Sequence, residues 1–332
     1  MSDKLYGAKI IGIGSYVPEK ILTNADLEKI VDTSDEWITT RTGIKERHVV
    51  GDSGEVTSDM CIAAGRRALA DAGLEPEDLD LLIIGTVTPD MRTPSAAVLV
   101  QKELGAFNAA AMDVNAACVG FIYALTTARA FVASGQYRNI LVFGSETLTS
   151  ITNYKDRGTC VLFGDGAGAV IVSRAANGDN NILATHIAAD GRHHGLLYVQ
   201  AGGSREPMTI DNIDNGVQYL KMNGSEVFKL AVRSMAQSAN AALEEAGLTV
   251  DDLDLVIPHQ ANIRIINSLG KKLGVPEEKV FINIERYGNT SSASIPIALV
   301  EARDQGRLKR GDLVLLVSFG GGLVWGAVLL RY

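Results

Sequence analysis

The sequence predicts an α/β protein built from two duplicated halves, because one segment occurs twice in a chain of alternating strands and helices. Residues 68–83, ALADAGLEPEDLDLLI, recur as residues 242–257, ALEEAGLTVDDLDLVI, at an offset of 174 positions. Each copy reads as the end of a helix, an Ala-Gly turn, an acidic loop and an apolar strand. Elsewhere, short strands rich in Val, Ile and Leu alternate with Ala-rich helical stretches. This alternation favours parallel sheets with helices packed on their faces.

The register of the repeat persists further along the chain. At the same offset, Asn115 aligns with Asn289 and Cys118 aligns with Ser292. Chance similarity between two amphipathic helices would not reproduce the turn, the strand start and these later positions. We therefore expect a pseudo-twofold axis that relates the two halves, with equivalent loops meeting near it and carrying the chemistry.

The length of 332 residues is sufficient for two ordinary domains with full cores. The Asn-Gly-Asp-Asn turn at residues 177–180 places the boundary between residues 1–178 and residues 179–332. Hydrophobic residues make up 46% of the chain, which argues against extensive disorder. The apolar runs are too short to cross a bilayer, and the N-terminus lacks the pattern of a signal peptide. We therefore expect neither a membrane span nor secretion.

Charge and cysteine content narrow the partners and the compartment. The net charge of −8 makes nucleic acid an unfavourable partner. Three cysteines, widely spaced and odd in number, argue against a disulfide framework and for a reducing cytoplasm. We expect a cytoplasmic protein without disulfides.

Two glycine patterns resemble phosphate-binding loops but predict close backbone packing. Gly12-x-Gly14 follows a strand, yet Val17 stands where a dinucleotide fingerprint needs its third glycine. The run of residues 164–168, GDGAG, continues as an apolar strand, whereas a phosphate-binding loop would open a helix. Both patterns are therefore interpreted as strands packed tightly against neighbouring backbone.

The three cysteines differ in context. Cys61 lies in the helical stretch 58–72 and Cys160 in the strand-like run 159–163, so both are interpreted as small core residues. Cys118 instead lies between a strand and a helix, with small neighbours. A thiol at a helix start meets unpaired N–H groups and the positive end of the helix dipole, which lower its pKa from about 8.5 toward neutrality. From these residues alone, a structural cysteine and a nucleophile are equally favoured.

The second half provides the partners that favour a catalytic cysteine. His259 follows the strand of residues 253–257, at a carboxyl strand end where ligand sites gather in α/β sheets. Its counterpart in the first half is Gly85, so the histidine is an acquired asymmetry. Asn289 lies in the duplicate of the loop that carries Cys118. A single His or Asn is more often a satisfied polar residue or a turn former, but the convergence of these three loops indicates a site.

At these residues the chain resembles the thiolase-like condensing enzymes, and specifically the β-ketoacyl-acyl carrier protein synthase III family. The resemblance covers essentially the whole chain. Thiolases have a second cysteine in the glycine-rich C-terminal region, which this chain lacks, and elongating synthases use two histidines where this chain has one His and one Asn. The motifs that carry the resemblance are AACVGF around Cys118, PHQANIRI around His259, RYGNTSSASIP around Asn289 and SFGGGLVWG at residues 318–326.

The resemblance implies a decarboxylative condensation that initiates fatty acid biosynthesis. The Cys118 thiolate would take an acyl group from acyl-CoA, and the backbone N–H groups of Cys118 and Gly321 would stabilise the tetrahedral oxyanion. Malonyl-acyl carrier protein would then lose carbon dioxide. His259 and Asn289 would donate hydrogen bonds to the resulting enolate, each contributing about 2–4 kcal/mol in a dry site. No metal or redox cofactor is implied.

Further positions match substrate contacts of the family. Trp37 and Arg157 match residues that sandwich the adenine of CoA, and Arg41 matches a neighbouring CoA contact; stacking of an aromatic ring with guanidinium planes suits this role. Ordinary half-buried packing is the alternative for Trp37, and its polar surroundings argue against it.

Acidic carrier protein requires a local basic surface on this acidic chain. Arg264, Lys271 and Lys272 are spaced to share one face of a helix, and Lys229 and Arg233 are four residues apart on another. A solvated helix face with lysines in its last turn is an equally favoured alternative.

Thr93 stands where the family often has a bulky aromatic residue. By resemblance, that residue reaches across a homodimer interface to close the acyl pocket of the neighbouring subunit. A threonine would leave more room, so we expect acyl primers that are longer or more branched than acetyl.

Three alternatives to this function are retained. A related synthase of secondary metabolism would share the fold and the three residues. A cysteine hydrolase would use the same residue types, with His259 as a base and a path for water to the acyl enzyme. A non-catalytic scaffold is disfavoured because Cys118, His259 and Asn289 are all present.

Overall fold

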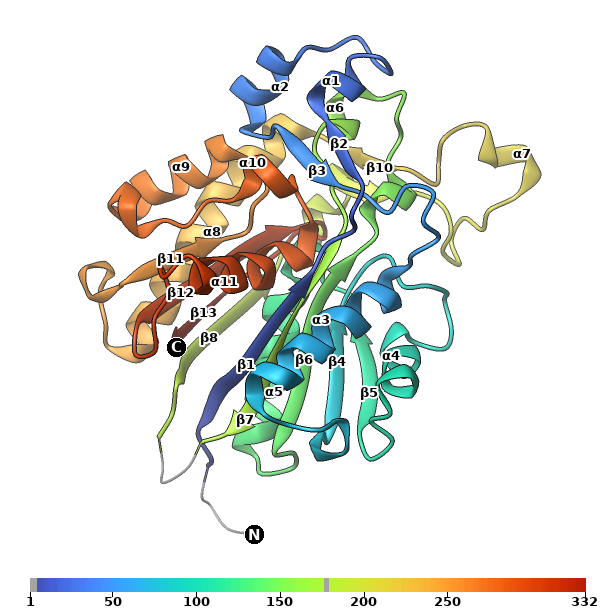
Figure 1. Cartoon of the computed structure of the whole chain (residues 1–332). Helices are drawn as coiled ribbons and strands as arrows, with labels where there is room; N and C mark the ends of the chain where they lie inside the picture. The colour runs from blue at the N-terminus through green and yellow to red at the C-terminus, as the bar shows by residue number, and fades with distance from the viewer. Residues whose placement is uncertain (1–4, 176–178) are drawn as a thin grey trace.

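Two β-sheets lie on either side of a central pair of helices, and further helices cover their outer faces (Figure 1). The computed structural model describes residues 5–175 and 179–332. The three packed cores of this arrangement correspond to the two faces of each sheet, with the central core shared by both. The expected α/β architecture of two similar sheet-and-helix halves is confirmed.

The two sheets have the same strand order, apart from one strand. The first has the order β1-β7-β6-β4-β5 and the second the order β8-β13-β12-β11. Pairing is mixed, with β4 parallel to β5 and β6 but β7 antiparallel to its neighbours, so the expectation of parallel sheets holds for only some of the strand pairs. The strands of the first sheet are β1 (Ala8–Tyr16), β4 (Leu81–Gly85), β5 (Ala110–Val114), β6 (Asn139–Glu146) and β7 (Gly166–Arg174). Those of the second are β8 (Ile182–Ala189), β11 (Leu255–Pro258), β12 (Leu313–Gly320) and β13 (Val324–Arg331).

The helices complete five alternating layers. α5 (Gly120–Ala133) and α11 (Ser294–Asp304) lie between the sheets. In β6, Ile140 and Val142 face these helices whereas Leu141 and Phe143 face the outer layer, as the two-residue period of a strand requires. Because both faces of each sheet are buried, the strands are apolar almost throughout. The outer helices are α3 (Thr57–Ala72) and α4 (Ala96–Leu104) on the first sheet, and α8 (Gly224–Ala246) and α9 (Ile263–Leu273) on the second.

The repeated sequence forms the same local structure twice, as predicted. α3 and α8 both end at a glycine in the left-handed region, Gly73 with φ of 64° and Gly247 with φ of 66°. This backbone conformation carries little penalty in glycine and closes the last turn of each helix. A short 3₁₀ turn then leads into a buried strand, through η1 (Pro76–Asp78) before β4 and η5 (Val250–Asp252) before β11.

The two glycine patterns are sites of close backbone packing, as interpreted from the sequence. A β-carbon at Gly12 would lie 2.4 Å from the carbonyl oxygen of Ala68 on α3. At Gly168 it would lie 2.6 Å from Cβ of Pro296 on α11. Neither pattern opens a helix, because Gly12 and Gly14 lie within β1 and the run of residues 164–168 leads into β7.

Smaller elements gather at the upper end of the sheets in Figure 1. Cys160 ends the short helix α6, so the expectation of a strand there is wrong, although its burial in a core is confirmed. All three cysteines are free, as expected. The elements of the upper end are β2 (Ile21–Thr23), α1 (Asn24–Leu27), α2 (Asp35–Thr42), β3 (Glu46–His48), η3 (Leu148–Ile151), α6 (Arg157–Cys160), η4 (Gly191–Leu196), β9 (Leu197–Val199), α7 (Ile210–Ile213) and β10 (Leu220–Met222). The remaining ones are η6 (Glu277–Lys279) and α10 (Ile284–Tyr287), with η2 and η7 described below.

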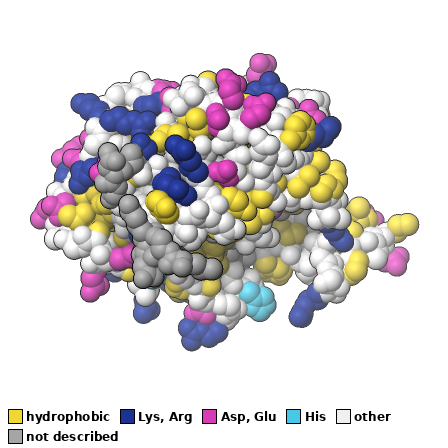
Figure 2. Space-filling model, turned by 90° about the horizontal axis from the view of Figure 1, so that it is seen from below, with side chains coloured by type: hydrophobic (Ala, Val, Ile, Leu, Met, Phe, Trp, Pro, Cys, Tyr) yellow, Lys and Arg dark blue, Asp and Glu magenta, His cyan; other side chains and the backbone are white. Residues whose placement is uncertain are grey.

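The lower surface of the molecule mixes charged and hydrophobic side chains (Figure 2). On the lower face, basic and acidic side chains are interspersed, with separate groups of hydrophobic side chains between them (Figure 2). Within the described ranges, every helix is too short or too polar to traverse a lipid bilayer. The expected boundary at residue 178 lies outside the described residues, between β7 and β8. The division into residues 1–178 and 179–332 therefore stays a proposal.

Candidate active site

Cys118 lies in a sharp turn between a strand and a helix, as predicted. β5 leads into the 3₁₀ turn η2 (Ala117–Val119), and α5 starts at the next residue. Ala117 has a φ of 46°, which is uncommon for a residue with a side chain and marks a strained turn. The hydroxyl of Ser318 on β12 donates to the carbonyl oxygen of Cys118 at 2.7 Å, so the second half fixes the turn of the first.

Cys118, His259 and Asn289 line a single cavity of about 830 Å³. One of these residues comes from the first half and two from the second, so the loops of both halves meet as expected. Much of the remaining lining is apolar and comes from both halves, including Leu148, Phe163, Leu197, Val227, Phe228, Met235 and Phe319. The structure therefore brings the three predicted catalytic side chains to one enclosed, largely apolar space.

The protonation state of Cys118 differs from the sequence prediction. Burial raises the pKa of the thiol to about 11, and the negative charge of Glu146 acts in the same direction. A hydrogen bond with the Ser291 side chain opposes this pKa shift but does not overcome it. The expectation of a pKa near neutrality is therefore wrong for the unliganded protein, because desolvation of the thiolate outweighs the favourable helix start. The raised pKa favours the thiol form of Cys118.

His259 is a buried, neutral imidazole. It follows β11, and burial lowers its pKa to about 3. Its Nδ1 atom lies 2.7 Å from the hydroxyl of Ser294, and this hydroxyl accepts the backbone N–H of Gln260 at 3.3 Å. The hydroxyl proton is then available for Nδ1, which favours the tautomer with a proton on Nε2. His259 is therefore suited to donate a hydrogen bond and poorly suited to accept a proton.

Asn289 is held by the backbone of the first half. Its N–H donates to the carbonyl oxygen of Leu162 at 2.8 Å, and its own carbonyl accepts the N–H of Gly164 at 3.1 Å. The side-chain Oδ1 accepts the N–H of Ser291 at 2.8 Å. Because Oδ1 is occupied, the amide NH₂ is the group that Asn289 can direct to a ligand as a donor.

The glycine run after β12 lies directly against the nucleophile. A β-carbon at Gly320 would lie 2.7 Å from the backbone nitrogen of Cys118 and 3.3 Å from Cβ of Ala117. Gly321 lines the same cavity as Cys118. The run therefore brings a second stretch of backbone beside the reacting sulfur, where a residue with a side chain would not fit.

Trp37 is flanked by two guanidinium groups. The centre of the Arg41 guanidinium lies 5.0 Å from the Trp37 ring centroid and that of Arg157 lies 4.9 Å from it. The three residues predicted to contact CoA thus form one cluster, on α2 and α6 at the upper end. Asn262 lines the cavity and donates to the carbonyl oxygen of Arg41 at 3.1 Å, so the cluster adjoins the cavity.

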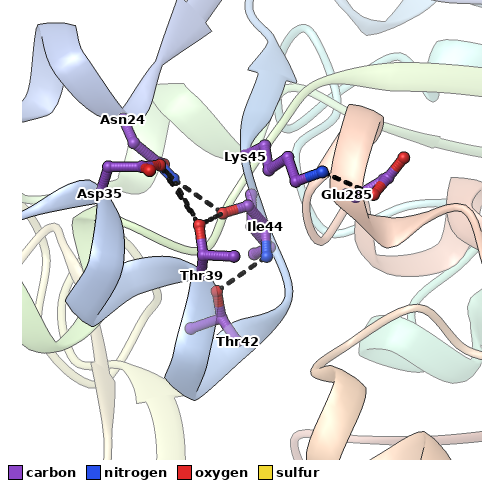
Figure 3. Close-up of polar contacts among 7 residues, drawn as sticks. All are labelled: Asn24, Asp35, Thr39, Thr42, Ile44, Lys45 and Glu285. Carbon is purple, nitrogen blue, oxygen red and sulfur yellow. Dashed lines mark hydrogen bonds and ion pairs between the residues drawn. The ribbon is translucent and has the colours of Figure 1, made fainter.

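A polar network holds α2 in place (Figure 3). Asn24 donates to Asp35 Oδ1 and to the carbonyl oxygen of Ile44, both at 2.8 Å. Lys45 then pairs with Glu285 of α10 at 3.3 Å. This ion pair links the lobe of residues 21–48, which contains β2, α1, α2 and β3, to the second half. The helix that carries Trp37 and Arg41 is therefore anchored to both halves.

The predicted docking and gate residues lie on the surface. All five basic residues, Lys229, Arg233, Arg264, Lys271 and Lys272, are exposed on the adjacent helices α8 and α9. Lys229 is paired with Glu226 at 2.8 Å. Thr93 is exposed and lies outside the cavity lining, whereas its neighbour Arg92 belongs to it.

Sequence reasoning missed two buried polar residues, Glu146 and Ser291. Glu146 is fully buried at the end of β6, and the Ser291 hydroxyl donates to its Oε1 atom at 3.1 Å. A signal was present, because the offset of 174 aligns Glu146 with Gly320 and Ser291 with Ala117. Both positions differ in residue type between the two halves, as the His259 position does.

The fold and the site define the class of protein. Two duplicated α/β halves, a cysteine at a strand–turn–helix junction, and a histidine and an asparagine from the opposite half form the arrangement of the thiolase-like condensing enzymes. Among the described residues, no group of three or more His, Cys, Asp or Glu side chains is placed to hold a metal ion.

The chain belongs to the β-ketoacyl-acyl carrier protein synthase III family. Two family models match it, 3-oxoacyl-[acyl-carrier-protein] synthase III over residues 112–191 and the C-terminal model of the same enzyme over residues 243–332. The β-ketoacyl-[acyl-carrier-protein] synthase III of Caldanaerobacter subterraneus subsp. tengcongensis is 53% identical, with alignment over 100% of this chain and 99% of the relative.

Solved structures agree with this assignment. The 3-oxoacyl-[acyl-carrier-protein] synthase III of Aquifex aeolicus VF5 superposes with a TM-score of 0.91 at 54% identity, covering 98% of this chain and 100% of that one. The priming β-ketosynthase of the R1128 polyketide biosynthetic pathway has a TM-score of 0.91 at 37% identity, covering 99% of this chain and 98% of that one. The family resemblance seen in the sequence motifs is confirmed.

Proposed function

We propose that this protein initiates fatty acid biosynthesis by condensing an acyl-CoA primer with malonyl-acyl carrier protein. One observation carries the proposal: a cysteine of the first half shares an enclosed cavity with a histidine and an asparagine of the second. The high identity to β-ketoacyl-[acyl-carrier-protein] synthases III favours this function over secondary metabolism, since the polyketide priming synthase is only 37% identical.

The first half-reaction transfers the primer to Cys118. The thiolate attacks the thioester carbonyl of acyl-CoA, a tetrahedral oxyanion forms, and CoA leaves. The backbone N–H groups of Cys118 and Gly321 stabilise the oxyanion. The fit of Gly320 against the Cys118 nitrogen supports this role, because it brings both stretches of backbone to the same place.

The second half-reaction decarboxylates the malonyl group. Loss of carbon dioxide leaves an enolate, which His259 and Asn289 stabilise by hydrogen bonds before its carbon attacks the acyl group on Cys118. The neutral state of His259 and the occupied Oδ1 of Asn289 support two donors. The same features disfavour a hydrolase with His259 as its base.

The surface sites bind the carriers of both substrates. Trp37, Arg41 and Arg157 bind the adenine of CoA, supported by their cluster beside the cavity. The basic residues of α8 and α9 dock the acidic carrier protein, supported by their exposure on adjacent helices.

A homodimer encloses the primer, with Thr93 at the pocket of the neighbouring subunit. β5 forms the end of the first sheet, so among the described residues one of its edges is open to pairing. Phe107, just before β5, is 73% exposed, which suits an interface better than solvent. The three free cysteines support a cytoplasmic location.

One assay tests the proposed function against its alternatives. The purified protein is incubated with acyl-CoA, a malonyl thioester and carrier protein, and the products are identified by mass spectrometry. A β-ketoacyl thioester is expected. Release of free acid would indicate a hydrolase, and absence of turnover would indicate a scaffold.

A further inference from the structure

Glu146 is a fully buried carboxylate that the reaction described above leaves unused. Its two oxygens face different halves of the molecule. The Oε1 atom faces the second half, where it accepts from Ser291 Oγ at 3.1 Å and lies 3.3 Å from Ser292 Oγ. The Oε2 atom is held within the first half by Thr86 Oγ1 at 3.1 Å, the N–H of Val87 at 3.0 Å and Thr88 Oγ1 at 2.8 Å.

Ser291 connects this carboxylate to the nucleophile. Its hydroxyl donates to Glu146 Oε1, and the same side chain lowers the pKa of the Cys118 thiol. The two turns that carry Cys118 and Ser291 pack against each other. Ser291 and Cys118 line the same cavity. Ser291 starts the 3₁₀ turn η7 (Ser291–Ala293) and has a φ of 52°, a strained conformation that only a tightly determined site maintains. This turn holds the hydroxyl against the carboxylate, at the wall of the cavity that Cys118 also lines.

We propose that Glu146, acting through Ser291, accepts the proton of the Cys118 thiol. The S–H bond breaks with its electron pair left on sulfur, and the proton passes to Ser291 Oγ. The original hydroxyl proton of Ser291 passes to Glu146 Oε1 in the same step. The products are a thiolate and a neutral carboxylic acid, whose proton later neutralises the departing CoA thiolate. This use of the thiolate rests on the proposed acylation of Cys118.

The protonation behaviour of the neighbouring groups agrees with this geometry. Burial raises the pKa of the Cys118 thiol, so it does not ionise near neutrality without an acceptor. Burial raises the pKa of Glu146 to about 7, which suits an acceptor that works near neutral pH. His259 has its pKa lowered to about 3 and is a poor acceptor.

The other elements around Glu146 contribute few titratable groups. Its partners from the segment after β4 and from η7 are hydroxyls and a backbone N–H. The titratable groups that feel its charge are the thiols of Cys118 on η2 and Cys61 on α3. The carboxylates of Asp90 and Asp113 act on Cys61, and burial raises the pKa of that thiol further, so it stays protonated.

The experiment measures thiol reactivity directly, without any substrate. Alkylation of Cys118 by iodoacetamide is followed between pH 5.5 and 9.5 in the wild type, Glu146→Gln and Ser291→Ala. We expect the rate in the wild type to rise through the pKa of Glu146, near 7. In both variants this rise should move to higher pH, with alkylation near neutrality slower by roughly 10²-fold, as for loss of a general base.

Ser292→Ala is the matched control. Ser292 lies against the same Glu146 oxygen, but its hydroxyl also donates to the carbonyl oxygen of Gly85 at 2.7 Å. It should keep the wild-type pH profile. A profile in Glu146→Gln or Ser291→Ala that matches this control would overturn the proposal. Thermal melts identify a variant that fails to fold, and Ser291→Ala, a small truncation, then remains as the test.

Acylation by acetyl-, butyryl- or octanoyl-CoA is then measured on the same proteins. If the wild type forms no acyl enzyme while alkylation still shows the shifted profile in the variants, the proposed function fails and the proton acceptor stands. If acylation proceeds with an unshifted profile in both variants, the proton acceptor fails and the proposed function stands.

Discussion

The two halves place different chemistry on the same backbone. At the offset of 174 residues, the turn that presents Cys118 corresponds to the turn that presents Ser292, and each is preceded by a residue with positive φ, Ala117 and Ser291. The thiol of Cys118 lines the cavity, whereas the hydroxyl of Ser292 is buried and donates to the carbonyl oxygen of Gly85. One copy of the turn therefore presents its side chain to the cavity, and the other uses its side chain to bond the backbone of the opposite half.

A second pair of equivalent positions also differs between the halves, with polar residues in the second half and glycines in the first. His259 and Ser294 are hydrogen-bonded in the second half, and the same offset aligns them with Gly85 and Gly120. In the first half these glycines pack so closely that a β-carbon at Gly85 would lie 2.3 Å from the Gly120 carbonyl carbon. Equivalent positions therefore hold a hydrogen-bonded polar pair in the second half and a close backbone contact in the first.

The largest expected effect concerns the two equivalent turns. Cys118→Ser should abolish acyl-enzyme formation, because a serine hydroxyl is far less acidic than the thiol that this site holds. Adding Ser292→Cys to that variant should not restore it, because position 292 is buried against Gly85. Intact-mass spectrometry after incubation with acyl-CoA measures acyl adducts on the single and the double variant. An acyl adduct on either protein would show that the two turns are interchangeable.

The next effect separates the halves by reaction step. His259→Ala and Asn289→Ala should each slow decarboxylation of the malonyl thioester by roughly 10²–10³-fold, because their hydrogen bonds strengthen as the enolate forms. Acylation of Cys118 should suffer much less. Single-turnover measurements of each half-reaction make the comparison. Equal losses in both steps would end the assignment of decarboxylation to the second half.

A smaller effect tests Glu146, which occupies the position of Gly320 in the other half. Its pKa is about 7 in the folded protein against 4.5 for the free side chain, so between these values the folded state binds the extra proton. Stability therefore falls as pH rises through this window. Glu146→Gln should remove this pH-dependent change in the free energy of unfolding, which amounts to up to about 3 kcal/mol. Urea unfolding of both proteins at pH 4.5 and pH 8 measures it, and parallel pH dependence in both would contradict the pKa.

The smallest effect concerns the acyl primer, which the proposed mechanism places on Cys118 of the first half. Thr93→Phe should narrow the acyl pocket of the dimer and shift kcat/KM toward acetyl-CoA, by up to about 0.8 kcal/mol for each methylene excluded. Decarboxylation of the malonyl thioester should not change. Rates with acetyl-, butyryl- and octanoyl-CoA decide it. A wild type confined to acetyl-CoA, or a variant with unchanged preference, would refute the role of Thr93.

The sequence predicted the features that repeat or interrupt a local pattern. The repeat placed the ends of α3 and α8 and the starts of β4 and β11, because helix ends and strand starts depend on nearby residues. The asymmetry at His259 identified a site residue for the same reason, since its counterpart is a glycine.

Other features depend on contacts between segments far apart in the chain. Cys160 was expected in a strand, but its apolar run instead packs as a short helix in a core that the sequence does not delimit. Burial by residues of both halves raises the pKa of Cys118. The helix start, which depends only on nearby residues, had predicted a lowered pKa. Apart from the repeat, which aligns Glu146 with a glycine, nothing near Glu146 in the sequence marked it, because the donors that bind it come from segments about 60 and 145 residues away along the chain.

Both substrate-facing regions enter the fold at the same topological position. In the first half, the chain between β1 and α3 carries the lobe with α2 and Trp37. In the second half, the chain between β8 and α8 carries β9 and β10, and Leu197 and Leu220 of these strands line the cavity. Each is an excursion between a first strand and a first helix, above an unchanged core. We therefore expect substitutions in these two excursions to change what the cavity admits, while the strands and turns that carry Cys118, His259 and Asn289 stay the same.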